Sequence, residues 1–407
     1  MIYISKIFLL VAIFLLPFSH FKLIYNFSIS DFSFLVSFFF IAIFQINNNI
    51  SFKKLLLDNE FLIPILLYSI GFFISMNSSF NPIDSLFGYF QILFIFIIIY
   101  YNFSFHNMSE SFLIKLLYLL AFTSSAITLF ILLYFFTNID YSFNMLSVYK
   151  GWGGRRFSYG LMEPNIAARI AAQSIPVLLL FSIKSKSILI KIFNSFFMFV
   201  VVASIILTAS RTGLVIMIIG FLSFFIFYYQ YSRKFNLFKL LTSCLIFVFL
   251  STIMISNYPD FIEPSFKRYS TILDPSSSSS SKERLLVLDK SLNLINQNPI
   301  IGKGMGNSHN LTGVSIHNPI ILSWLENGFI GFVGFMLIYI IIIYYIVAAY
   351  YNRFFMSNVL LLLAVISIMM VVGDMFMANS YKRVLWVPAI LFIIYFKQLN
   401  RNQLIKS

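Results

Sequence analysis

Long, uninterrupted apolar runs dominate this chain and constrain its fold more than any other feature. A helix needs about 20 apolar residues to cross the hydrocarbon core of a bilayer, and 60% of the 407 residues are hydrophobic, enough for roughly twelve crossings. Only 10% are charged, whereas a soluble domain carries about 25%. The runs are continuous, unlike the alternating strands of a membrane β-barrel. The sequence therefore predicts an all-α, polytopic membrane protein.

The apolar runs predict about twelve spans. They cover residues 3–18, 32–46, 61–76, 87–104, 113–136, 162–182, 192–209, 212–231, 238–256, 328–349, 357–376 and 385–397. The first run has no small-residue cleavage site after it, so we expect a retained span rather than a signal peptide. With no internal repeat and no second apolar-poor region of domain size, residues 1–407 are predicted to form a single transmembrane domain.

Basic residues predict how the spans are oriented. With the N-terminus inside, the inner segments hold fourteen Lys and Arg, and the short outer loops hold seven. Positive charge is concentrated on the cytoplasmic side, so we expect both termini in the cytoplasm. Residues 137–161 and 257–327 then face outward. The net charge of +14 has this explanation, and we expect no nucleic-acid partner because no soluble basic stripe with stacking aromatics is present.

The large outer loop, 257–327, is predicted to be periplasmic and to carry part of an active site. It contains a serine run, 276–281, that is typical of a flexible tether. Apolar residues then recur at helical spacing at Leu285, Leu288, Leu292 and Ile295. Ser280 and Glu283 fit a capping box, and Pro299 ends the pattern. We expect an amphipathic helix against the membrane surface or the mouth of the bundle.

The motifs of several enzyme classes are missing from the sequence. It has no P-loop, no dinucleotide-binding fingerprint, no HExxH and no Cys/His ligand set. The aspartates of the outer segments are far apart in sequence. The single cysteine, Cys244, excludes an intrachain disulfide. We therefore expect no metal and no cofactor.

Arginines occur on the outer side, where the orientation rule disfavours them. The four are Arg155, Arg156, Arg211 and Arg284. An arginine at the end of a span often anchors to lipid headgroups. Four on one face instead favour a bound anion, because the guanidinium group donates paired hydrogen bonds to phosphate and stays charged.

Arg169 differs from these because it lies about two turns inside the sixth predicted span. An arginine at that depth either extends to the interface or pairs within the bundle. Asp374, in the eleventh predicted span, is a possible partner.

Five short motifs follow one another between residues 155 and 335. His317-Asn318 is followed after nine residues by Gly328 and after two more by Gly331. The others are Arg156-Phe157-Ser158 with Pro164-Asn165 and Ala167-Ala168, TASRTG at 208–213, Arg284 with Leu288, and NPIIGKG at 298–304. The second His-Asn pair, His309-Asn310, lacks the glycines. In their order along the chain, from Arg156 to Gly331, the five motifs resemble those of the bacterial O-antigen polymerase and O-antigen ligase family.

The resemblance implies a glycosyltransferase of the bacterial inner membrane, acting in surface polysaccharide or lipopolysaccharide biosynthesis. Such enzymes transfer a glycan from an undecaprenyl-pyrophosphate carrier to a hydroxyl acceptor at the periplasmic face. We favour a polymerase, which joins lipid-linked repeat units, because only the shared core of the motifs is present. A ligase acting on lipid A core is the alternative. A flippase or transporter of lipid-linked glycans is a second alternative. Such proteins are expected to have charged residues within their spans, and this chain has few. A chain-length regulator and a flippase are the implied protein partners.

His317 is the candidate catalytic base, because an imidazole has a suitable pKa for accepting a proton from a hydroxyl. The four outer arginines would bind the pyrophosphate and stabilise its departing charge. Pro164 and Asn165 are expected to support the site.

Two neighbours of His317 allow more than one role. Asn318 could orient His317 or cap the helix that Pro319 begins. Glu326 could fix the tautomer of His317 or lie at an interface. The glycines at 328, 331 and 334 most simply allow close helix packing.

Overall fold

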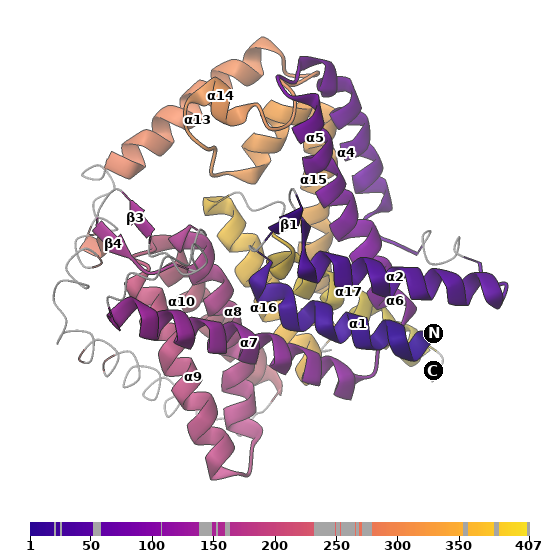
Figure 1. Ribbon diagram of the computed structural model, residues 1–407, viewed down its shortest axis with the longest axis vertical. Helices are drawn as coiled ribbons and strands as arrows, with labels where there is room; N and C mark the ends of the chain where they lie inside the picture. The colour runs from indigo at the N-terminus through magenta and orange to yellow at the C-terminus, as the bar shows by residue number, and fades with distance from the viewer. Residues whose placement is uncertain are drawn as a thin grey trace.

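In the computed structural model, helices form most of the described part of the chain (Figure 1). The structure describes residues 1–19, 22–24, 27–51, 58–106, 108–137, 149–151, 154–158, 163–231, 249, 253, 265, 268–270, 279–352, 357–377 and 382–404. Within these ranges the strands form two short hairpins that the sequence pattern did not predict. β1 (Lys22–Ile24) pairs with β2 (Phe27–Ser28), and β3 (Tyr149–Gly151) pairs with β4 (Gly154–Arg156).

Eight helical segments of the described ranges are long and apolar enough to cross a membrane. They are α2 (Ile29–Asn47), α5–α6 (Pro82–Phe105), α7 (Glu110–Thr137), α8 (Pro164–Lys184), α9 (Ile188–Leu207), α10 (Arg211–Tyr231), α15 (Pro319–Tyr351) and α16 (Asn358–Phe376). The predicted all-α, polytopic membrane class is confirmed.

Three further helices coincide with predicted spans. They are α1 (Ile2–Leu15) with η1 (Leu16–Phe18), α4 (Leu62–Ser75) with η2 (Met76–Ser78), and α17 (Arg383–Leu404). The ninth predicted span, 238–256, lies outside the described residues except at Phe249 and Ile253. Each predicted span with a described structure therefore has a helix.

The fourth predicted span is not a regular α-helix. It consists of α5 (Pro82–Leu93), a π-helical segment η3 (Phe94–Ile99) and α6 (Tyr100–Phe105). The Asn59 amide donates to the carbonyl of Phe96 (2.8 Å), and the Asn102 amide donates to that of Ile98 (2.9 Å). Hydrocarbon cannot satisfy backbone groups, so these amides help to make an irregular segment possible at this depth.

Both ends of the chain lie at one end of the bundle (Figure 1). Ser5 of α1 is hydrogen-bonded to His106 (2.8 Å), and Gln398 of α17 donates to the carbonyl of Met108 (3.2 Å). The start of α1 and the end of α17 therefore meet at the connection between α6 and α7. These contacts place the two helix ends on the same side of the bundle.

At the opposite end, α8, α10 and α17 begin and α9 and α16 end. We call this the site end. Arg169 of α8 donates to the carbonyl of Met377, just after α16 (3.2 Å). Arg383, the first residue of α17, forms a buried ion pair with Asp31 of α2 (3.0 Å). These contacts fasten the helices to one another where the candidate residues lie.

The predicted helix of the large loop is present as α13 (Ser279–Gln297) and is followed by the short α14 (Ser308–Thr312). The capping box was wrong, because Ser280 lies inside the helix. The predicted apolar face was only partly right, since Leu285 and Leu292 are 65% and 42% exposed. Tertiary packing instead buries the face that contains Val287, Ser291 and Ile295.

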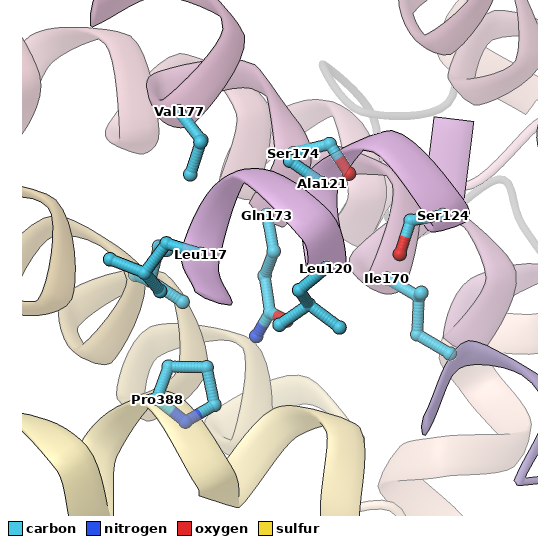
Figure 2. Close-up of a pocket in the computed structure, with 10 residues that line it drawn as sticks. Leu117, Leu120, Ala121, Ser124, Ile170, Gln173, Ser174, Val177 and Pro388 are labelled. Carbon is cyan, nitrogen blue, oxygen red and sulfur yellow. The ribbon is translucent and has the colours of Figure 1, made fainter. Parts of the chain in front are cut away.

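A small cavity lies inside the bundle between α7, α8, α16 and α17 (Figure 2). Its walls are mainly apolar, and Gln173 points into it. Ser124 and Ser174 add hydroxyl groups, and Pro388 of α17 closes one side. No charged side chain lines this cavity, so it does not suit a diphosphate, and the candidate site lies elsewhere.

Candidate functional site at the end of the bundle

The packing of α13 places Arg284 near His317. Arg284 shares one face of α13 with Val287, Ser291 and Ile295, because these residues follow it at helical spacing. Val287 and Ile295 pack in a small apolar cluster with Ile316 and Leu325. Since Ile316 immediately precedes His317, the cluster that fixes α13 also sets the position of the candidate base.

His317 is half-buried just before α15. Burial lowers the pKa of its imidazole to about 4, and the positive charge of Arg284 contributes in the same direction. The imidazole is therefore neutral at neutral pH and can accept a proton. The next residue, Asn318, caps α15 by accepting hydrogen bonds from the N–H groups of Ile320 (2.9 Å) and Ile321 (3.2 Å). The prediction that Asn318 caps this helix is confirmed.

Further charges surround Arg284. Burial lowers the pKa of its guanidinium, and the nearby charges of Arg211 and Arg268 lower it further. The carboxylates of Glu163 and Glu283 act in the opposite direction. Arg284 is thus close enough to interact electrostatically with Arg211, Arg268 and His317. We call these four residues the cationic cluster.

The turn between α9 and α10 places Arg211. Ala209 takes a left-handed backbone conformation (φ 49°), which is uncommon for a residue other than glycine. Ser210 then caps α10, because its hydroxyl accepts a hydrogen bond from the N–H of Gly213 (3.0 Å). A Cβ on Gly213 would lie 2.4 Å from the Cβ of Ala168. The TASRTG motif therefore makes a tight turn that packs the start of α10 against α8.

Arg155 and Arg156 lie on β4, but the positions of their side chains are outside the described residues. The backbone beside them is described. The N–H of Phe157 donates to the carbonyl of Leu207, the last residue of α9 (3.1 Å). This bond places the backbone of Arg156 next to the turn that leads to Arg211.

Pro164 is the first residue of α8 and is buried, followed by Asn165. Proline suits this position because its missing N–H would have no partner in the helix. One turn later, Arg169 is 1% exposed and pairs with Asp374 of α16 at 2.5 Å. The hydroxyl of Tyr339 in α15 donates to the same carboxylate (2.9 Å). The predicted pairing of Arg169 with Asp374 is confirmed, and the pair joins three helices beneath the site.

Glu326 organises the glycine-rich turn between α13 and α14. Its carboxylate accepts hydrogen bonds from the N–H of Gly306 (3.0 Å) and from Ser308. Its backbone carbonyl accepts from the N–H of Gly304 (2.9 Å). Asn307 connects this turn to the end of η2, where its amide donates to the carbonyl of Ser78 (2.9 Å). The contacts of Glu326 are thus with the turn.

The three glycines of α15 pack closely, as expected. Gly328 has φ 65° and ψ −173°, and it kinks the helix where the turn at Ile300 approaches. Gly331 and Gly334 face α4: a Cβ on Gly334 would lie 2.5 Å from the N atom of Tyr68. Residues 298–306 and α4 can therefore contact α15 directly, which fixes the turn beside the site.

The sequence prediction did not include two residues whose charges act on Arg284 in the folded protein, Arg268 and Glu163. Neither belongs to a motif by itself, and Arg268 stands next to Lys267 in what resembles an ordinary basic segment. Within the described ranges, no group of three His, Cys, Asp or Glu side chains is arranged to hold a metal ion.

The sequence of residues 196–336 matches a family model described as O-antigen ligase. This region, about a third of the chain, contains Arg211, Arg268, Arg284 and His317. No curated protein matches the chain. This match supports the resemblance of the chain to the O-antigen polymerase and ligase family, and it includes four of the five sequence motifs.

Proposed function

We propose that this protein is an O-antigen polymerase. It joins undecaprenyl-pyrophosphate-linked repeat units by glycosyl transfer at the periplasmic face of the bacterial inner membrane. The observation that supports this proposal best is the position of Arg284 beside His317, with Arg211 nearby. A group that can accept a proton thus lies next to groups that can bind a diphosphate.

The reaction requires two kinds of assistance, and the cluster offers both. The acceptor hydroxyl oxygen forms a bond to the anomeric carbon while the bond from that carbon to the pyrophosphate oxygen breaks. The hydroxyl proton passes to the neutral imidazole of His317. The electron pair of the broken bond leaves with the lipid pyrophosphate, whose developing charge the arginines stabilise. The pyrophosphate leaves unprotonated, so this step needs no general acid.

The low pKa of His317 has a chemical meaning in this scheme. Before the donor binds, Arg284 helps to keep the imidazole neutral. When the diphosphate binds, its negative charge offsets that of Arg284, and the imidazolium formed during transfer becomes more favourable. The base is therefore ready before the substrate binds and stronger afterwards.

The acceptor distinguishes the polymerase from the ligase. We favour a second lipid-linked repeat unit, because the described outer segment between residues 279 and 318 consists of α13, α14 and a turn packed on the start of α15. These elements are small for docking a core oligosaccharide. The termini would then face the cytoplasm and residues 257–327 the periplasm.

The test is reconstitution of the purified protein in liposomes with purified undecaprenyl-pyrophosphate-linked repeat units. A ladder of glycan lengths is expected. Transfer only to added lipid A core would indicate the ligase instead, and translocation without any transfer would indicate a transporter. Either result would overturn the polymerase proposal.

The matched pair of variants is His317→Ala and His309→Ala. The second removes the exposed histidine of the other His-Asn pair. Loss of a general base lowers turnover about 10² to 10⁴-fold, so His317→Ala should lose the ladder and His309→Ala should keep it. Full activity of His317→Ala would contradict its assignment as the base.

A further inference from the structure

Two segments that are remote in sequence meet at the C-terminal end of α9. The N–H of Phe157 donates to the carbonyl of Leu207 (3.1 Å). The hydroxyl of Tyr269 donates to the carbonyls of Ile205 (3.3 Å) and Ile206 (3.1 Å). The last four carbonyls of a helix accept none of its regular i to i+4 hydrogen bonds, so both segments bind to carbonyls that remain available for additional donors at this end of α9.

Each of these anchors has an arginine directly before it in the sequence. Arg156 precedes Phe157, and Arg268 precedes Tyr269. The anchored helix end is followed by the turn that leads to Arg211. The backbones of three arginines from separate parts of the chain therefore lie near the end of α9. Arg156 and Arg268 each precede a residue that is hydrogen-bonded to α9, and Arg211 follows the turn after α9.

Arg284 joins this group from the other side. Arg268 and Arg284 flank the serine run 276–281, and the charge of Arg268 acts on Arg284 in the folded protein. Arg268 is partly exposed and is not enclosed within the bundle.

A purely structural explanation has to be considered first. The C-terminal end of a helix carries partial negative charge and attracts cations, so one arginine beside α9 needs no ligand. Arg284 is different, because it comes from α13, is partly buried, and is affected more strongly by the charges of Arg211 and Arg268 than by the nearby carboxylates. Positive charges held close together repel one another and destabilise the folded protein. A bound anion with several negative charges attracts each of them and makes the arrangement favourable. The arrangement thus favours an anion held by several arginines.

We propose that Arg268 is a further binding residue for the diphosphate of the lipid-linked donor, acting together with Arg211 and Arg284. This inference rests on the proposed function for the identity of the ligand. It assigns to Arg268 a direct role in holding the anion, in addition to any role in fastening its own segment to α9.

The experiment compares Arg268→Ala with Lys282→Ala. Lys282 is an exposed residue of α13, two positions before Arg284, so the control removes one positive charge from the same outer segment. Binding of inorganic pyrophosphate to the detergent-purified protein is measured by calorimetry, and transfer kinetics are measured in liposomes. We expect Arg268→Ala to weaken pyrophosphate binding and raise KM for the donor roughly tenfold or more, and Lys282→Ala to change both less than about twofold.

Arg268→Lys keeps the charge and provides a variant that is closer to the native protein. Lysine is a point charge without the planar fork of donors, so its pyrophosphate affinity should lie between those of the wild type and Arg268→Ala. Thermal denaturation of all three variants reports on folding. A lower melting temperature of Arg268→Ala with unchanged pyrophosphate affinity would show a structural role only and overturn the proposal.

The outcomes also separate this inference from the proposed function. If the wild type transfers glycan and Arg268→Ala binds pyrophosphate as tightly as the wild type, the inference alone fails. If the wild type transfers nothing but binds pyrophosphate in a manner that depends on Arg268, the proposed function fails and the anion site remains.

Discussion

Arg284 and His317 are close enough for the guanidinium charge to lower the pKa of the imidazole, although 33 positions separate them in the sequence. This proximity depends on α13, which packs on Ile316 through the face that carries Arg284. A charged group and a potential base are thereby held together at the end of a helical bundle.

The first prediction concerns the acid limit of activity. Because burial and Arg284 lower the pKa of His317 to about 4, the base is neutral above that pH and becomes protonated below it. The acid limb of kcat/KM, which reports on the free enzyme, should therefore have its midpoint near pH 4 and not near the ordinary histidine value of about 6.5. A midpoint near 6.5 would contradict this environment for His317.

The second prediction removes the charge of Arg284. In Arg284→Gln the pKa of His317 should rise above 4 but stay below its ordinary value, because burial is the larger cause of the shift. The pH dependence of carbethoxylation of His317 measures this directly, since only the neutral imidazole reacts. The rate is obtained as the difference between proteins with His317 and with His317→Ala. Lys282→Ala should leave the midpoint unchanged.

The third prediction concerns the buried pair of Arg169 and Asp374. Asp374→Asn leaves a buried guanidinium without its compensating charge, which typically costs about 3–5 kcal/mol. A marked fall in the melting temperature in detergent is expected. The double variant Arg169→Met with Asp374→Leu removes both charges and should recover most of the loss. If Asp374→Asn melts like the wild type, the pair does not stabilise the bundle.

The fourth prediction compares two glycines with positive φ. In Gly328→Ala the new Cβ would lie 2.0 Å from the carbonyl oxygen of Ile300, in a backbone conformation (φ 65°) unfavourable for alanine. Gly313 also has positive φ (83°), but nothing lies within 4 Å of its Cβ position. Gly313→Ala should therefore show only backbone strain of about 1–3 kcal/mol or less, whereas Gly328→Ala should be clearly less stable in thermal denaturation. Equal stabilities would show that the turn at Ile300 can move away.

Much of the fold follows from local properties of the sequence. The lengths of the apolar runs predict the spans, because a bilayer offers no partner to backbone groups and leaves helices as the natural solution. Asn318 before Pro319 predicts a helix start for the same local reason, since both residues satisfy the first turn. The spacing of the glycines in α15 predicts close packing, although it does not name α4 or the turn at Ile300 as the neighbour.

The predictions that failed concerned which face of a helix is buried and where the helix begins. Periodicity identified α13 as a helix, but its buried face was misplaced because Leu285 and Leu292 are as apolar as the residues that are buried. Only the position of Ile316 and Leu325 selects the face with Val287 and Ile295. The capping box failed because Ser280 is one of several equivalent serines, and the sequence does not show which of them precedes the helix.

The sequence by itself determined that this is a helical membrane protein with arginines and a histidine outside its spans, because composition and local pattern are sufficient for that. Tertiary structure alone decided which of these groups meet. It brought Arg268 to the end of α9 through Tyr269, gave Glu326 to the glycine-rich turn, and set Arg284 beside His317. Such relationships arise from contacts between segments remote in the chain, and a single sequence carries no local signal for them.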